Sequence, residues 1–174
     1  MEGNRAWDNG LREHALECYQ MLVDRFPNLP DGYNKLGVVS AELGNLQEAE
    51  RYFLTAIDCD RKHVPSLSNL GNICLERGDL DEAIAYYALA LESDPEYPPA
   101  HHNLAVAYRK KGELGVFVRH LKKSQRFERQ RDRLSLQAGN ATRWQKTAAR
   151  VPDRWWIWVM VLILVLFAVG RALR

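Results

Sequence analysis

The sequence predicts an all-α fold, in which a solenoid of helical hairpins is followed by a basic helical stem and one transmembrane helix. Three observations predict it. Related residues recur every 34 positions, as in GNLQEAERYFLTAIDCD and GDLDEAIAYYALALESD. Positive charge gathers over residues 109–154, and residues 155–170 carry no charge at all. The 174 residues are enough for one globular body and an additional segment.

The period of 34 residues divides each repeat into two short helices. Glycines recur at positions 10, 44, 78 and 112, small residues at 37, 71 and 105, and aromatic residues at 19, 53 and 87. We expect the glycines at 44, 78 and 112 to end the first helix of a pair, because glycine tolerates positive φ. The small residues would let the paired helices approach closely, and the aromatic rings would fill the remaining space. No catalytic role is needed to explain these positions.

This pattern resembles the tetratricopeptide repeat (TPR), whose helical pairs stack into a superhelix. Residues 30–63 and 64–97 match it best, and residues 1–29 keep only part of a repeat, because about half of the first helix is missing. Residues 98–129 keep Asn103, Leu104 and Gly112 but depart afterwards, as a divergent terminal repeat or capping helix would. The resemblance implies about three and a half repeats with a protein-binding surface.

Residues 130–154 are predicted to form a basic juxtamembrane stem. Residues 1–108 hold 8 Lys and Arg against 18 Asp and Glu, a balance of −10, whereas residues 109–154 hold 14 against 4, a balance of +10. These cations either solvate a helix that continues from the last repeat, or they meet lipid headgroups or an acidic partner. Aromatic residues are sparse there, so no nucleic-acid partner is expected. The candidates for contact with the membrane surface are Arg143, Lys146, Arg150 and Arg154.

Residues 155–173 are predicted to form a transmembrane helix. The 16 uncharged residues from Trp155 to Gly170 would rise about 24 Å as a helix, slightly less than a hydrocarbon core. A buried core helix is the alternative, and the charged stem before the run speaks against it. The basic residues ahead of the span predict a tail-anchored protein with its repeats on the cytosolic side. The membrane would be a bacterial plasma membrane or a mitochondrial outer membrane.

The candidate binding surface is the concave face that the first helix of each pair would line. Asn69 and Asn103 share one repeat position, and Asn72 follows one turn after Asn69. Such amides can pair with the backbone of an extended peptide, or they can be solvated or bond neighbouring backbone. The first reading is similar to the asparagine ladders of the TPR domain in the glycosyltransferase that adds N-acetylglucosamine to nuclear and cytosolic proteins. By the period, the face comprises Asp31, Asn34, Lys35, Val38, Ser68, Asn69, Asn72, Glu76, His102, Asn103, Val106, Arg109 and Lys110.

A second precedent in the family is the clamp that grips the C-terminal carboxylate of heat-shock chaperones. It relies on basic and asparagine residues at set positions of successive first helices. The resemblance places Asn34, Pro99 and Asn103 where basic residues of that clamp would stand. Chaperone docking by this route is therefore not expected.

No catalytic site, metal site or cofactor is expected from the sequence. His101 and His102 are adjacent, so on a helix their side chains would point about 100° apart. Cys59 and His63 stand one turn apart but lack two further ligands. The three cysteines form no CxxC pair and are interpreted as reduced thiols. The first ten residues lack the apolar stretch of a secretory signal.

The sequence therefore predicts a membrane-anchored scaffold or assembly adaptor that binds a partner peptide or helix in its groove. Self-assembly into a homo-oligomer is the alternative. The incomplete first repeat would leave apolar surface near Trp7 and Leu11 that another copy could cover. A non-catalytic subunit of a membrane enzyme is the third reading.

Overall fold

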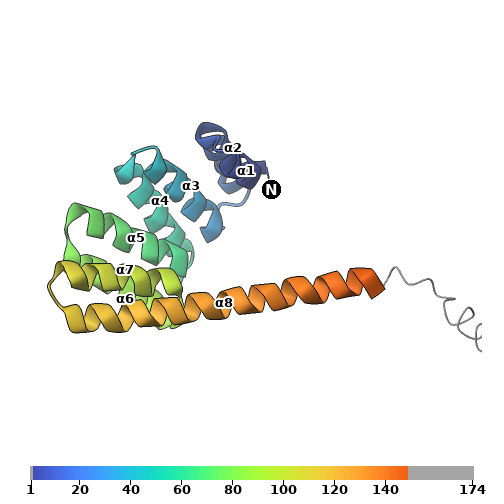
Figure 1. Cartoon of the computed structure of the whole chain (residues 1–174). Helices are drawn as coiled ribbons and strands as arrows, with labels where there is room; N and C mark the ends of the chain where they lie inside the picture. The colour runs from blue at the N-terminus through green and yellow to red at the C-terminus, as the bar shows by residue number, and fades with distance from the viewer. Residues whose placement is uncertain (1, 149–174) are drawn as a thin grey trace, which may run out of the picture. The chain divides into compact units, whose positions relative to one another are not determined.

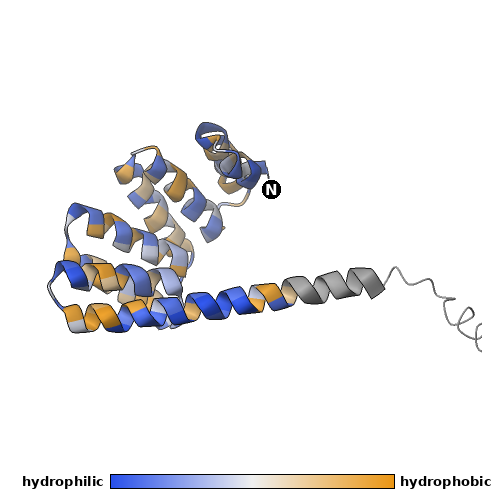
Figure 2. Ribbon diagram, in the orientation of Figure 1, coloured by the Kyte–Doolittle hydropathy of each residue, from blue (hydrophilic) through white to orange (hydrophobic). Residues whose placement is uncertain are grey.

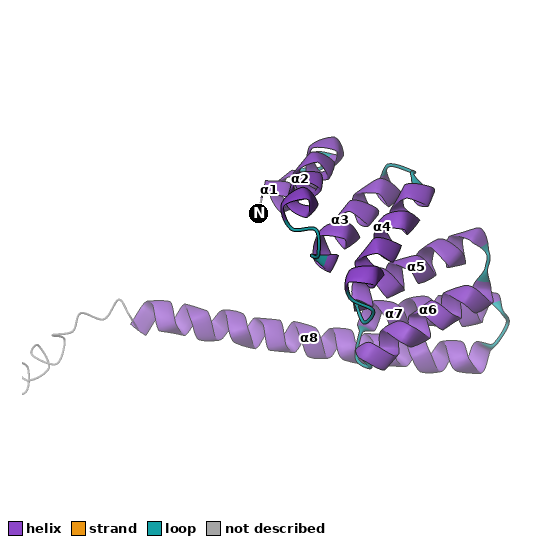
Figure 3. Cartoon of the chain, turned by 180° about the vertical axis from the view of Figure 1, so that it is seen from behind, coloured by secondary structure: helices purple, strands orange, loops and turns teal. Residues whose placement is uncertain are grey.

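The computed structural model describes residues 2–148, with side chains to residue 138, and this part of the chain contains helices and no strand (Figures 1 and 3). The predicted all-α class is confirmed for these residues. The helices are α1 (Glu2–Asp8), α2 (Arg12–Arg25), α3 (Pro30–Glu42), α4 (Leu46–Cys59), α5 (Val64–Arg77), α6 (Leu80–Ser93), α7 (Pro98–Lys110) and α8 (Leu114–Ala148).

Consecutive helices form hairpins that are closed by a glycine in the left-handed region. Gly10, Gly44, Gly78 and Gly112 have φ angles of 77°, 84°, 94° and 83°. A side chain at such a φ would clash with its own backbone, so the repeated glycine is a requirement of the turn. The predicted role of the glycines at 44, 78 and 112 is confirmed.

The helices of a hairpin approach closely where a small residue meets an aromatic ring. A Cβ added to Gly37 would lie 2.5 Å from Cε1 of Phe53, and one added to Gly71 would lie 2.5 Å from Cε1 of Tyr87. Both distances are far below van der Waals contact, so any side chain at these glycines would displace the ring. The predicted pairing of small and aromatic residues is confirmed at both positions.

The apolar core continues from one hairpin to the next. Phe53 of α4 packs in one cluster with Leu70 of α5, and Tyr87 of α6 packs in the next cluster with Leu104 of α7. Each ring therefore contributes to the hairpin that carries it and to the hairpin that follows. Ser68 belongs to this interior, because it is only 2% exposed. Its predicted place on the binding face was wrong: at this position α5 faces the neighbouring helices.

Arg12 contacts Trp7 of the N-terminal hairpin and Glu42 of the next helix pair. α1 has 7 residues and ends at Asp8, one residue after Trp7. The guanidinium of Arg12 lies 3.9 Å from the centroid of the Trp7 ring and donates to the Trp7 carbonyl oxygen at 2.7 Å. It also pairs with Glu42 of α3 at 2.5 Å. One face of the indole is thus covered, while Leu11 beside it remains 54% exposed.

The chain divides into two compact units, residues 1–128 and residues 129–174. In the first unit, α8 packs on α7 through His120, which contacts His101, and through Phe127, whose ring stacks on His101 with 5.5 Å between centroids. In the second unit, α8 continues to Ala148. The helices within residues 2–148 include none that is long and apolar enough to cross a membrane.

The predicted transmembrane helix over residues 155–173 lies outside the described residues. The same holds for Arg150 and Arg154 and for the side chains of Arg143 and Lys146. These predictions stay predictions.

Candidate functional site

The first helices α3, α5 and α7 carry the predicted binding residues on the surface of the first unit. Asn34, Asn69 and Asn103 are half-buried, whereas Asn72 is exposed. We call these four residues the asparagine row. The helices that carry them are neighbours, since side chains of α5 reach both α3 and α7. The row therefore crosses three repeats.

Hydrogen bonds join the asparagine row from one repeat to the next. The Nδ2 group of Asn69 donates to Oδ1 of Asn34 at 3.0 Å, and Nδ2 of Asn103 donates to Oδ1 of Asn72 at 2.6 Å. Within α5, Nδ2 of Asn72 lies 3.5 Å from Oδ1 of Asn69. The structure thus shows these amides bonding one another, an arrangement that neither reading of the sequence specified, and peptide binding by them stays a prediction.

The side chain of Asn72 joins α5 to both α6 and α7. Its Oδ1 accepts from Asn103 and also from the buried hydroxyl of Tyr87, at 2.8 Å. A carbonyl oxygen has two lone pairs, so both are used. Burial, and then the nearby Cys74, raise the pKa of the Tyr87 hydroxyl, which keeps it a donor.

The two ends of the asparagine row keep groups available for a partner. Oδ1 of Asn34 accepts from Asn69 and from the Ser66 hydroxyl at 3.1 Å, which leaves its Nδ2 group without an acceptor among the described residues. At the other end, Oδ1 of Asn103 receives no hydrogen bond from that part of the chain. One end therefore offers a donor and the other an acceptor, and internal hydrogen bonds hold both in place.

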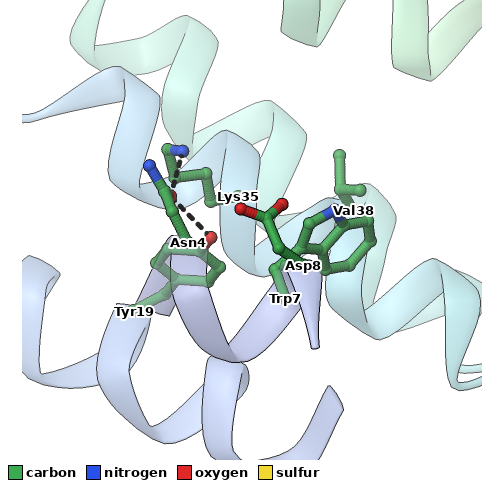
Figure 4. Close-up of a pocket in the computed structure, with 6 residues that line it drawn as sticks. All are labelled: Asn4, Trp7, Asp8, Tyr19, Lys35 and Val38. Atoms are coloured by element: carbon green, nitrogen blue, oxygen red, sulfur yellow. Dashed lines mark hydrogen bonds between the residues drawn. The ribbon is translucent and has the colours of Figure 1, made fainter. Parts of the chain in front are cut away.

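A pocket of about 360 Å³ lies at the N-terminal end of the same face (Figure 4). Two predicted groove residues, Lys35 and Val38, line it. The Lys35 ammonium donates to Oδ1 of Asn4 at 2.8 Å and lies 5.2 Å from the centroid of the Tyr19 ring. Apolar walls and opposite charges therefore meet in one cavity. The other lining residues, which the sequence analysis missed, are Asn4, Trp7, Asp8 and Tyr19.

The repeat period could have revealed part of this pocket. The Tyr19 hydroxyl donates to Oδ1 of Asn4 at 2.8 Å, and the Tyr87 hydroxyl makes the same bond to Asn72 at 2.8 Å. Asn4 precedes Asn72, and Tyr19 precedes Tyr87, by twice the period. The intervening repeat has Val38 and Phe53 at these positions, so the hydrogen bond returns only in alternate repeats. A search at twice the period would have found it.

The remaining predicted groove residues are not among those that line the pocket. The Lys110 ammonium donates to the Leu75 carbonyl oxygen at 3.3 Å, and the Arg109 guanidinium lies 5.9 Å from the Phe117 ring centroid. Val106 is half-buried, while Glu76 and His102 are exposed. Asp31 contacts His63 at 3.3 Å.

The described residues hold no cluster suited to a metal ion, that is, no group of three or more His, Cys, Asp or Glu side chains with the required proximity. The three cysteines are free. Burial raises the pKa of the Cys74 thiol to about 11, with Glu82 adding to the shift, so this thiol is a poor nucleophile at neutral pH.

Family models for tetratricopeptide repeats match most of the repeat region. Two models described as tetratricopeptide repeats match residues 1–64 and 52–85, and one described as a TPR repeat matches residues 71–112. No curated protein matches the chain.

Several solved structures share the fold at low sequence identity. A crystal structure of MamA is 24% identical, covers 75% of this chain and 77% of its own, and has a TM-score of 0.64. The first TPR domain of Spaghetti (RPAP3), bound to the HSP90 peptide SRMEEVD, is 23% identical over 63% of this chain and 87% of its own, with a TM-score of 0.59. PilF of Pseudomonas aeruginosa is 22% identical, covers 73% of this chain and 58% of its own, and has a TM-score of 0.67.

Proposed function

Because the chain belongs to the tetratricopeptide repeat family, we propose that it is an interaction scaffold or assembly adaptor, anchored in a membrane, that holds a partner peptide or helix against its first helices. The observation that carries the proposal is the asparagine row. Its amides are held by bonds to one another, and its ends offer a donor on Asn34 and an acceptor on Asn103. Amides in fixed positions suit the backbone of a bound segment, since they recognise it without selecting its side chains.

The pocket beside the asparagine row supplies the side-chain selectivity that the amides lack. Trp7 and Val38 give it apolar walls, and Lys35 and Asp8 add one charge of each sign. A single side chain of the partner would anchor there, as anchors in pockets dominate most peptide complexes. The structure of Spaghetti (RPAP3) with a bound HSP90 peptide supports peptide binding by this fold. We do not extend the chaperone ligand to this chain, because Asn34 and Asn103 stand where basic residues would be needed.

The test is crosslinking in native membranes followed by mass spectrometry, with a pair of matched variants. Asn34→Asp keeps the acceptor that Ser66 and Asn69 use but removes the free amide donor. Asn45→Asp makes the same change at an exposed site before α4. We expect about tenfold weaker capture of the partner by Asn34→Asp, equivalent to about 1.4 kcal/mol, and unchanged capture by Asn45→Asp. If both variants captured the partner equally well, the asparagine row would not be part of the binding site.

The membrane anchor is a separate part of the proposal. Residues 155–173 would span the bilayer, with the tryptophans at 155, 156 and 158 at one interface. The repeats would remain on the cytosolic side of a bacterial plasma membrane or a mitochondrial outer membrane. Flotation of the full chain with lipid vesicles in high salt tests the anchor, since an inserted helix resists salt. Release into the soluble fraction would contradict it.

Self-assembly remains a second candidate because of the N-terminal end. Leu11 is 54% exposed, and Trp7 is half-buried. A second copy could cover this surface. Light scattering of the detergent-solubilised full chain at several concentrations separates the two candidates, since a monomer at every concentration would exclude self-assembly. A non-catalytic subunit of a membrane enzyme is the third candidate, tested by whether an activity co-purifies with the chain.

A further inference from the structure

One face of α8 carries a continuous row of cations, which we call the α8 basic row. At three- and four-residue spacing, and about 100° per residue, its members fall within about 80° around the helix over a length of about 21 Å. All of them are exposed, and in Figure 2 this part of α8 is mostly blue with orange segments between. The members are Arg119, Lys122, Arg126, Arg129 and Arg133.

Acidic side chains do not neutralise the α8 basic row. No member pairs with a carboxylate within residues 2–138, whereas Arg77 pairs with Glu50 and Lys111 pairs with Asp81. The two acids of the same stretch, Glu128 and Asp132, lie about 100° to 140° around the helix from the centre of the row. A solvent-exposed helix face whose charges serve only solubility usually carries both signs. Here the face that carries the row holds cations only, although the exposed Glu128 and Asp132 lie elsewhere around the helix.

We propose that the α8 basic row binds the anionic lipid headgroups of the membrane, so that α8 lies along its surface. The inference rests on the proposed anchor, because only 22 residues along the sequence separate Arg133 from the uncharged run at Trp155, which keeps the row near the bilayer. Four of the five cations are arginines, whose planar guanidinium pairs with phosphate oxygens in a bidentate way.

Two further features favour lipid over an acidic protein as the occupant. Leu114 and Val118, which are 62% and 43% exposed, border the α8 basic row and would rest at the interface. The balance of −10 over residues 1–108 would repel the repeats from an anionic surface while the row is attracted. The charges alone would then favour contact of α8, rather than of the repeats, with the membrane.

The experiment measures how fast an amine-reactive reagent acylates Lys122, relative to Lys62, in the full chain in proteoliposomes. Lys62 is exposed in the loop before α5 and serves as the internal reference. The vesicles contain phosphatidylcholine alone or phosphatidylcholine with phosphatidylglycerol at about 2:1, at low and high salt. We expect Lys122 to react about fivefold more slowly in anionic vesicles at low salt, and the difference to vanish at high salt.

A matched pair of triple variants tests the row itself. Arg126→Glu, Arg129→Glu and Arg133→Glu together reverse three members, and should abolish the protection of Lys122. The control reverses three exposed arginines of the repeats, Arg5→Glu, Arg51→Glu and Arg61→Glu, and should preserve it.

Equal reactivity of Lys122 in the two vesicle types, or protection that survives in the row variant, would overturn the inference. Protection by added polyglutamate or RNA, with none from anionic lipid, would also overturn it. Flotation in high salt is scored on the same samples. Loss of flotation would count against the anchor, while salt-sensitive protection of Lys122 would still support the row.

Discussion

Two histidines at the α7–α8 contact should make the stability of the repeats depend on pH. His101 is 2% exposed, and its Nε2 lies 3.0 Å from the Pro95 carbonyl oxygen, which can only accept. Nε2 therefore carries the proton, and Nδ1 of the neutral ring is an acceptor. Nδ1 of His120 lies 3.1 Å away and must donate to it. This arrangement is satisfied when both rings are neutral.

The surroundings of the two rings disfavour their protonation. Burial lowers the pKa of His101, and Lys123 adds to this, while the Pro95 carbonyl and Asp94 oppose it. Burial, then His101, Lys123 and Arg119 lower the pKa of His120 to about 4. The other groups packed here, the rings of Tyr108 and Phe127, carry no charge to offset an imidazolium.

The sign of the effect follows from the lowered pKa values. The unfolded chain binds these protons near pH 6.5, and the folded chain binds the His120 proton near pH 4. The stability contributed by the neutral pair is therefore complete above about pH 6.5 and is lost as the pH falls from about 6.5 to about 4. The full difference for His120 corresponds to about 3 kcal/mol, and solvent screening of this partly exposed ring reduces it to about 1–2 kcal/mol.

The assay is urea unfolding of the detergent-solubilised full chain at pH 7.5 and pH 5, followed by circular dichroism. His120→Gln keeps an amide donor for His101 but does not titrate, so we expect it to remove about half or more of the pH dependence. His102→Gln changes the exposed neighbour and should leave the dependence intact. The reasoning is refuted if the wild-type chain is equally stable at both pH values, or if His102→Gln has the larger effect.

Two other predictions concern stability and thiol reactivity. Gly71→Ala should lower the free energy of unfolding by about 1–3 kcal/mol, because its Cβ would stand 2.5 Å from the Tyr87 ring, and denaturant titration measures this. Gly115→Ala, where nothing lies within 4 Å, is the control and should leave stability unchanged or raise it. A thiol reagent at neutral pH should label the exposed Cys59 at least about tenfold faster than Cys74, whose burial raises its pKa, and comparable rates would contradict the assigned burial.

The fold of the repeats was readable from the sequence because its determinants are local and periodic. A glycine at a fixed position closes each turn, and small residues that recur at the repeat period mark where paired helices approach closely. Gly37 and Phe53 belong to one hairpin, so their contact follows once the two helices are recognised. Ser68 shows the limit of this reasoning. The period placed it on the binding face, but neighbouring helices bury it at that position.

The candidate site was only partly predictable. The period identified Asn69 and Asn103 as equivalent and put Lys35 on the same face. It did not show that Asn103 bonds to Asn72, or that the Tyr87 hydroxyl shares the same acceptor. Those bonds depend on side-chain rotamers and on the distance between successive repeats, neither of which the period determines.

The sequence by itself therefore determined the order of the helices, the hairpin turns and the segregation of charge along the chain. Only the tertiary structure decided which polar groups form hydrogen bonds within the protein and which remain available to a partner. The pairing of His101 with His120 is the clearest case, since 19 residues separate them and their contact exists only because α8 packs on α7. Turn conformation and helical periodicity arise from neighbouring residues, whereas hydrogen bonds between helices require the packed distances of the finished fold.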